Sequence, residues 1–451
     1  MKKLLKAAFI NPKGAERNSG SSILPDILPE LGESIIFIGD DTEFVPHLGL
    51  LTIAALLPEY TEAVYIDEEF IQPEEMDKYL SEENFDLVCL SAYNPQAFRA
   101  YEIAGIYKKR GITVIMGGLH ASSLPEEAAQ YVDSVFVGEA EETFPVFVRD
   151  FENGDIKKFY KSLNPPDMEN SPAPRFDIVR NFHIYNKIPL IATRGCPHSC
   201  DFCVFPTVYH SSFRHKKTEQ VIREIEMVRK LHPDPFISFS DENMLADRTF
   251  AKELAGAMKN LDIAWECYCD IGIAQDDELL DLLEQSGCQL VQIGLETIDP
   301  ANLENVDPWK FRQVSGYPQA IRKIQKAGVP VMAMFIAGFD GDDAGIFSRL
   351  KRFIMENRIR EIDFAIMTPM PGTPLFGRLK EEGRILTEDW NKYTWTHVNF
   401  QPLRMKAEEL QAGPLKLFRD FNDMASKMAK RKAEFTPSLP YHVSHGENNE
   451  K

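Results

Sequence analysis

The chain has few cysteines and comparatively little positive charge. It contains seven cysteines in 451 residues, and 50 basic side chains stand against 69 acidic ones, giving a formal net charge of −19. Binding to a nucleic-acid backbone relies on a basic surface, so this balance disfavours a nucleic-acid partner. Three of the cysteines are clustered, which is typical of metal ligation in a reducing compartment rather than of a disulfide scaffold. We therefore expect a cytoplasmic protein.

Long apolar runs are also missing. No uninterrupted apolar stretch approaches the roughly 20 residues that a membrane-spanning helix needs. The apolar run near the N-terminus is too short for a signal peptide and is better interpreted as a first strand. Hydrophobic residues make up 44% and charged residues 26%, which is ordinary for a soluble globular protein. The length allows about two or three domains.

The clustered cysteines are Cys196, Cys200 and Cys203, in a C-x3-C-x2-C pattern. The loop between them is too short to send the side chains apart, so they converge on one centre. Zinc sites and four-iron clusters both normally take four ligands, and no fourth ligand follows at a zinc-type spacing. Three thiolates on a four-iron cube would leave one iron open. The alternatives are structural thiols, or a zinc knot with His198 or His210 as the fourth ligand.

This spacing, with Phe202 before the third cysteine, resembles the signature of the radical S-adenosylmethionine (radical SAM) enzymes. The resemblance implies a [4Fe-4S] cluster on the three cysteines, whose open iron is chelated by the amino and carboxylate groups of SAM. It further implies that an electron from the cluster cleaves SAM to a 5′-deoxyadenosyl radical. A donor such as flavodoxin or ferredoxin would supply that electron.

Residues 1–155 alternate apolar strands and helices, which predicts a Rossmann-like, parallel α/β domain. Strands are expected at 4–10, 63–66, 86–91, 113–116 and 134–137, and helices at 47–57 and 98–110. Ligands of such sheets bind beyond the carboxyl ends of the strands, where small residues let a flat ligand approach the backbone. The small residues at these ends are Ser91, Gly117, Gly118 and Gly138.

Three segments of this domain, at 46–50, 117–120 and 137–141, resemble the cobalamin-binding domain that precedes one branch of radical SAM enzymes. The resemblance implies cobalamin, as methylcobalamin, contacted by Ser91, Gly117, Gly118, His120, Gly138 and Glu139. The D-x-H-x-x-G pattern that places a histidine under cobalt is absent. The lower face of the corrin is then left to water or to a residue other than histidine. A solvated loop histidine is the alternative for His120, and a generic flavodoxin-like domain is the alternative for the whole segment.

A proline-rich linker is expected at 156–185, and alternation resumes at 186–375. Strands are expected at 188–193, 236–240, 263–268, 290–293, 329–336 and 362–367. The helices between them are expected at 217–231, 250–260, 278–286, 317–327 and 346–357. Six such repeats predict an open, partial (β/α)6 barrel with its active site at the carboxyl ends of the strands.

Two motifs at these strand ends carry the expected SAM contacts. Asp241, Glu242 and Asn243 follow the second strand, where the family resemblance implies a motif that binds the SAM amino group; carboxylates suit an ammonium donor. The alternative is that they only cap the next helix. Gly294 and Glu296 follow the fourth strand and resemble the segment that meets adenine and ribose, although Glu296 could instead be a structural ion-pair partner.

The other cysteines exclude additional clusters. Cys89 stands alone in the first domain, so the second three-thiolate cluster of methylthio-transferring enzymes is excluded. Those at 267, 269 and 288 are interpreted as inert buried thiols. A helical cap is expected at 376–433 and a frayed tail at 434–451. Aromatic residues at 390, 393 and 395 either line a substrate pocket in this cap or pack structurally.

The resemblance as a whole is to the cobalamin-dependent radical SAM group that includes anaerobic magnesium-protoporphyrin cyclase and hopanoid methylases. It implies an enzyme that methylates an unactivated carbon of a small molecule or lipid. One alternative is a cyclase or oxidase of the same group that uses cobalamin without methyl transfer. The other is a corrinoid-binding sensor without catalysis.

Overall fold

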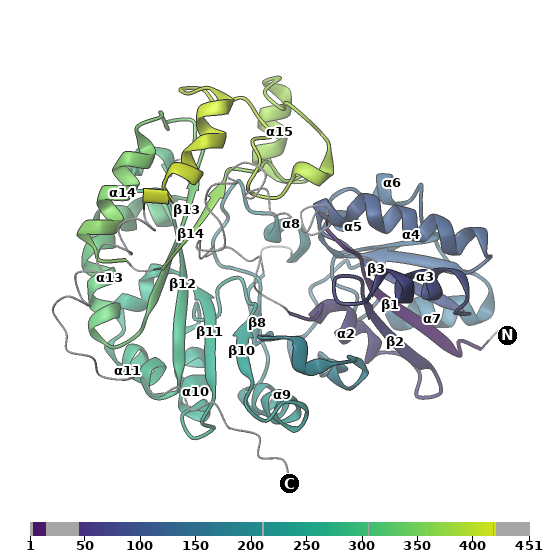
Figure 1. The fold of residues 1–451 in the computed structure, drawn as a ribbon. Coiled ribbons are helices and arrows are strands. Elements are labelled where there is room, and N and C mark those ends of the chain that lie inside the picture. Colours follow the sequence, from purple (N-terminus) through teal and green to yellow (C-terminus); the bar gives the residue numbers. More distant parts are fainter. Residues whose placement is uncertain are drawn as a thin grey trace, which may run out of the picture.

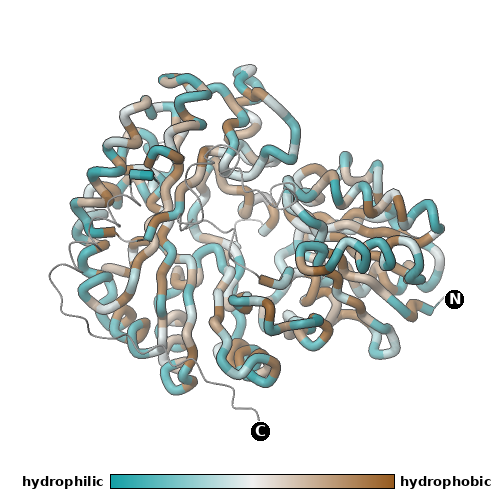
Figure 2. Tube along the Cα trace, in the orientation of Figure 1, coloured by the Kyte–Doolittle hydropathy of each residue, from teal (hydrophilic) through white to brown (hydrophobic). Residues whose placement is uncertain are grey.

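The computed structural model describes residues 3–14, 45–209, 212–304, 306–359, 361–417 and 419–420. Two parallel α/β units lie side by side, with the N-terminal one in purple and blue and the larger one in teal to green (Figure 1). Apolar residues concentrate on the strands and polar residues on the outer helices (Figure 2). In the part of the chain that is described, no helix is long and apolar enough to cross a membrane.

The N-terminal unit is a six-stranded parallel sheet of order β2-β1-β3-β4-β5-β6. Its strands are β1 (Lys6–Asn11), β2 (Glu62–Asp67), β3 (Leu87–Ser91), β4 (Thr113–Gly117), β5 (Ser134–Val137) and β6 (Phe159–Lys161). Its helices are α2 (Leu48–Ala54), α3 (Pro73–Ser81), α4 (Ala97–Lys109), α5 (Gly118–Ser123), α6 (Pro125–Ala128) and α7 (Phe144–Asn153). The five predicted strands are present, and β6, which the sequence did not predict, lies within the expected linker.

The position of β1 next to β3 creates the crevice in this sheet. The chain order reverses between these two strands, as in flavodoxin-like sheets, and the connections on either side leave the sheet in opposite directions. All five residues of β3 are buried, as expected of a strand covered on both faces. The carboxyl ends of β1, β3 and β4 form the edge at which the topology predicts a ligand.

The second unit is an open sheet of six parallel strands, in the order β14-β13-β12-β11-β10-β7. The strands are β7 (Ile188–Leu190), β10 (Phe236–Phe239), β11 (Ala264–Cys269), β12 (Cys288–Glu296), β13 (Val331–Ala337) and β14 (Glu361–Ile366). The helices that follow them are α9 (Thr218–Leu231), α10 (Arg248–Met258), α11 (Asp277–Gln285), α12 (Pro308–Gln313), α13 (Tyr317–Lys326) and α14 (Ile346–Glu356). This confirms the predicted partial (β/α)6 barrel.

The cysteine loop is closed by a small antiparallel pair of strands, β8 (Thr193–Arg194) and β9 (Arg214–His215). The three clustered cysteines lie between these strands, and the short helix α8 (Phe205–Tyr209) completes the loop. The sequence predicted one strand over 188–193. The structure divides it into β7 and β8, so that the chain leaves the barrel sheet before it reaches the cysteines.

The segment after the barrel covers part of both units. It contains α15 (Pro374–Glu381), a short 3-10 turn η10 (Trp390–Lys392) and a helical stretch at 407–417. Trp390 and Tyr393 are buried in the apolar cluster of the N-terminal unit, which favours the packing interpretation for both, whereas Trp395 is 44% exposed. The rest of the expected cap helix and the expected tail lie outside the described residues.

Candidate cofactor site

The two chain segments that enter and leave the cysteine loop, residues 193–195 and 212–215, lie side by side and form its neck. This neck requires a glycine. Gly195 follows β8 with a φ of +82°, in the left-handed region that favours glycine. A Cβ atom on this residue would overlap the carbonyl oxygen of Ser212 on the opposite side of the neck. The two sides of the loop can therefore approach closely just before Cys196.

Two carboxylates after β10 hold this neck from the barrel side. Asp241 accepts hydrogen bonds from the backbone N–H groups of Ala192 and Thr193, and Glu242 Oε2 accepts one from Gly195 N over 2.8 Å. Burial raises the pKa of Asp241 to about 6, and burial with the charge of Asp241 raises that of Glu242 to about 7. The N-cap of α10 is Asp247, so the capping alternative for these residues is wrong. The contacts point to a role in shaping the loop.

The three thiols are partly buried and lie among polar partners. Cys200 Sγ donates to Asp307 Oδ2 over 2.9 Å, and Asn243 Nδ2 lies 3.8 Å from Cys196 Sγ. Burial raises the pKa of all three thiols, that of Cys203 to about 12.

Three thiols on one short loop suit a four-iron cube, because the thiolates of a cube bind different irons. Among the described residues, no three His, Cys, Asp or Glu side chains are placed to hold one metal ion. His198 Nε2 lies 3.4 Å from Asp270 Oδ2, so this proposed zinc ligand pairs with a carboxylate. The other proposed zinc ligand, His210, lies outside the described residues.

A buried ion pair lies beside Cys200. Glu296 ends β12 with a φ of +63°, and its Oε1 pairs with Lys310 Nζ of α12. A Cβ on Gly294 would overlap the Glu296 carboxylate and lie 3.0 Å from Lys310 Nζ, so the glycine leaves room for the pair. The structural alternative for Glu296 is therefore realised in this geometry. The side chains of Glu296 and Lys310 are 11% and 10% exposed.

The sequence interpretation missed Lys310, although its neighbourhood carries a recognisable signal. Asp307 caps α12 through its side chain, and Pro308 is the first residue of the helix. An acidic N-cap residue followed by proline is a strong signal for the start of a helix. The helix that begins here carries Lys310 about one turn after the cap. A predicted helix at this point would have placed a cation near the end of β12.

The turn after β4 packs closely against the end of β3. Gly118 has a φ of +88°, and a Cβ on it would lie 2.6 Å from Ser91 Oγ and 3.1 Å from the backbone nitrogen of Ala92. Gly117 ends β4 beside it. Asn94 is buried, and its Nδ2 has no hydrogen-bond partner among the described residues. The buried, unsatisfied amide of Asn94 fits a corrinoid that supplies an acceptor at the strand ends.

The structure does not place the other predicted corrinoid contacts on this crevice floor. His120 is fully buried, so the solvated-loop alternative is wrong; its Nε2 lies 2.8 Å from Tyr101 Oη and 3.3 Å from Glu127 Oε1. Trp390 of the cap donates to the same Glu127 carboxylate over 3.0 Å. This histidine therefore belongs to a contact between the N-terminal unit and the cap.

The motif after β5 turns toward the cysteine loop. Gly138 has a φ of +81°, and the next residue, Glu139, is 6% exposed and forms ion pairs with Arg194 and Arg214 of β8 and β9. Phe202, also a predicted cofactor contact, is partly buried and packs edge-on against Phe339 at 6.1 Å. Both residues are thus joined to the barrel unit.

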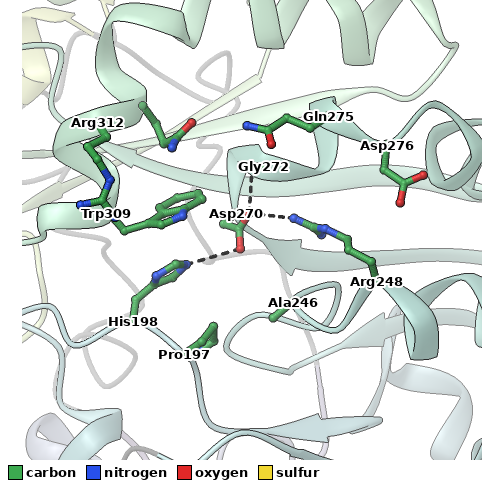
Figure 3. Close-up of a pocket in the computed structure, with 11 residues that line it drawn as sticks. Pro197, His198, Ala246, Arg248, Asp270, Gly272, Gln275, Asp276, Trp309 and Arg312 are labelled. Carbon is green, nitrogen blue, oxygen red and sulfur yellow. Dashed lines mark hydrogen bonds and ion pairs between the residues drawn. The ribbon is translucent and has the colours of Figure 1, made fainter.

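A pocket of about 680 Å³ opens beside the cysteine loop. Figure 3 shows His198 of the loop facing Asp270, with Trp309 alongside and Arg248 and Arg312 at the margins. Burial alone would raise the pKa of Asp270, but hydrogen bonds from His198 and Asn243 and the charge of Arg248 lower it to about 2. Because Asn243 also touches Cys196, Asp270 links this pocket to the cluster site.

Comparison with known proteins identifies the family. The sequence model of the Radical SAM superfamily matches residues 190–354, and that of the B12 binding domain matches residues 36–148. A bacteriochlorophyllide d C-12(1)-methyltransferase of Chlorobaculum tepidum is 31% identical over 381 residues, which are 83% of this chain and 82% of the relative. The chain belongs to the cobalamin-dependent radical SAM family. It is therefore an enzyme whose cofactors are a [4Fe-4S] cluster, SAM and cobalamin.

A second relative and a solved structure are also similar to this chain. A hopanoid C-2 methylase of Rhodopseudomonas palustris is 25% identical over 361 residues, covering 78% of this chain and 67% of the methylase. The solved structure of the radical SAM methyltransferase TsrM from Kitasatospora setae, with cobalamin and a [4Fe-4S] cluster bound, superposes with a TM-score of 0.64 at 15% identity. The superposition covers 95% of this chain and 99% of TsrM and shows that the fold is shared.

Proposed function

We propose that this enzyme transfers a methyl group to an unactivated carbon of a small molecule or lipid. The proposal rests mainly on the contact between the two units at the carboxyl ends of their strands. Glu139, which follows β5 of the N-terminal sheet, forms ion pairs with the neck of the loop that holds the three thiols. When bound, the cluster and SAM supply a 5′-deoxyadenosyl radical, and methylcobalamin supplies the methyl group. A substrate carbon held between the two edges would lie within reach of both cofactors.

The residues of the chain would divide the work of binding between them. Cys196, Cys200 and Cys203 would hold the cluster, and Asp241 and Glu242 would fix the loop that carries them. The opposite charges of the Glu296–Lys310 pair suit the amino and carboxylate groups of SAM. The corrinoid would bind at the carboxyl ends of β3 and β4, where the buried amide of Asn94 would donate to it.

Tetrapyrroles are the substrate class to test first. The relative of Chlorobaculum tepidum that covers most of this chain is named for methylation of bacteriochlorophyllide d, and the R. palustris relative is named for methylation of a hopanoid. Both names give a carbon atom as the site of methylation.

All seven cysteines are unpaired, which favours a reducing, cytoplasmic setting for the reaction.

Labelled SAM tests the methyl transfer. The anaerobically reconstituted enzyme, incubated with CD3-labelled SAM, a reductant and a panel of tetrapyrroles and hopanoids, should yield a product heavier by one CD3 group in place of hydrogen. Mass spectrometry measures the label, and enzyme without cobalamin is the control. A modified product without label would establish cyclisation or oxidation instead. Neither product nor 5′-deoxyadenosine from any substrate would favour the corrinoid sensor.

We further propose that a small acidic electron carrier, a flavodoxin or ferredoxin, docks at the pocket of Figure 3. Pro197 and His198 of the cysteine loop line this pocket, so it brings the surface close to the cluster. Asp270 is neutralised by Arg248 and Asp276 by Lys252, whereas Arg312 is exposed and has no carboxylate partner among the described residues. The margin therefore offers a cation on an otherwise acidic protein, which favours an acidic partner.

Reversing this charge should slow reduction by the protein donor alone. Arg312→Glu is expected to lower the rate of cluster reduction by flavodoxin by about tenfold or more at low salt, because a repulsive rim charge slows encounter. Reduction by dithionite, a small molecule, should be unchanged. Arg223→Glu on α9 makes the same charge change away from the pocket and is the matched control. Equal slowing by both variants would show that net charge, and not this pocket, governs reduction.

A further inference from the structure

The carboxylate of Glu139 forms ion pairs with both sides of the neck of the cysteine loop. Glu139 Oε1 lies 2.7 Å from Arg194 Nη1 on β8, and Glu139 Oε2 lies 2.8 Å from Arg214 Nη2 on β9. Arg194 and Arg214 are directly paired residues of these two strands. The single side chain therefore joins the N-terminal unit to the strand that enters the cysteine loop and to the strand that leaves it.

The charges at this contact are balanced. Two neighbouring arginines would repel each other, and Glu141 Oε1 lies 2.5 Å from Arg194 Nη1, so two carboxylates meet two guanidinium groups. The side chains of Glu139 and Arg194 are 3% and 11% exposed. Ion pairs removed from water in this way are costly to break, because the remaining partner keeps an uncompensated buried charge.

The backbone around Glu139 explains why it points to the neck rather than into its own sheet. Gly138 adopts a left-handed conformation, and its N–H donates to Ser122 Oγ of α5 over 3.0 Å. A Cβ on Gly138 would lie 3.7 Å from the carbonyl oxygen of Val208, which belongs to α8 of the cysteine loop. The turn after β5 is therefore seated directly against the loop.

We propose that Glu139 is a positioning residue that fixes the cluster relative to the corrinoid. Its backbone follows β5, at the sheet edge where the corrinoid would bind, and its carboxylate holds the base of the loop where the cluster would bind. The inference rests on both cofactors being present, as in the proposed function, but not on which molecule is methylated. The residue sets the separation across which a substrate carbon is presented to the two cofactors.

The magnetic coupling between the two cofactors measures this separation without any substrate. Protein reconstituted with cob(II)alamin and a dithionite-reduced cluster contains two paramagnetic centres, whose dipolar interaction appears in the electron paramagnetic resonance (EPR) spectrum. The wild-type protein is expected to show one well-defined coupling. Glu139→Gln should lose the defined coupling and give a broadened one, while iron and cobalamin contents stay at wild-type levels. Arg214→Gln, which frees one side of the neck, should broaden it less.

Two comparisons make this result decisive. Glu142→Gln removes an exposed carboxylate three residues after Glu139 and should leave the coupling unchanged. A wild-type coupling in Glu139→Gln would overturn the inference, and so would a loss of bound cobalamin with an unchanged coupling in the molecules that retain it, because Glu139 would then be a corrinoid contact. The CD3 experiment with the wild-type enzyme tests the proposed function separately, so either hypothesis can fail alone.

Discussion

Replacing Cys200 by alanine should abolish SAM cleavage. Three thiolates are the fewest that hold the cluster while leaving one iron open, and the loss of one leaves two protein ligands for four irons. The anaerobically purified variant is expected to lack the brown chromophore and to form 5′-deoxyadenosine only at the background level. Iron analysis, the visible absorption spectrum and chromatography of the nucleoside measure these losses.

A buried thiol elsewhere in the barrel is the matched control. Cys288 begins β12, is 4% exposed and has its pKa raised by burial, so it is packed away from solvent. Cys288→Ala should keep the iron content and the SAM cleavage of the wild type at a modest cost in stability. Retention of the chromophore after all three loop cysteines are changed to alanine would contradict the assignment of the cluster to this loop.

Placing a methyl group on Gly118 should remove cobalamin binding while SAM cleavage continues. The left-handed φ of +88° costs an L-residue about 1–2 kcal/mol, and the added Cβ would lie 2.6 Å from Ser91 Oγ and 3.1 Å from the nitrogen of Ala92, so the end of β3 would have to shift. The Gly118→Ala variant is therefore expected to lose most of its bound cobalamin, measured by absorption after desalting. Its iron content and its formation of 5′-deoxyadenosine should remain close to those of the wild type.

The same substitution in a helix separates local crowding from a general effect of the added methyl. Gly105 lies within α4, where an added Cβ would meet nothing within 4 Å. Gly105→Ala should keep cobalamin and raise stability by up to about 1 kcal/mol, because alanine favours the helix. Full cobalamin occupancy in Gly118→Ala would place the corrinoid elsewhere.

The sequence was sufficient for the architecture because both sheets are built from buried parallel strands. Such strands are short, nearly continuous apolar runs, as in β3 and β13, and glycines mark several of the helix ends between them. The cluster site could also be predicted from the sequence, because its three cysteine ligands are close together in the chain. Strand β6 was missed because its three residues lie in a proline-rich segment that reads as a linker.

The side-chain contacts between the units could not be predicted from the sequence. Glu139 and Arg194 are 55 positions apart, and nothing in the local pattern of either indicates that they meet. The motif around Glu139 was therefore interpreted as part of the corrinoid site, whereas its carboxylate lies on the neck of the cysteine loop. Asp241 was likewise assigned to SAM, although its oxygens accept backbone N–H groups of the chain that enters this loop.

The proposed mechanism depends most on an iron that the three cysteines leave open to SAM. The EPR spectrum of the reduced wild-type cluster, recorded before and after SAM is added, tests this directly. SAM is expected to shift the spectrum, because its amino and carboxylate groups would become ligands of the fourth iron. An unchanged spectrum at saturating SAM would show that no iron is open, and it would contradict the mechanism proposed for this enzyme.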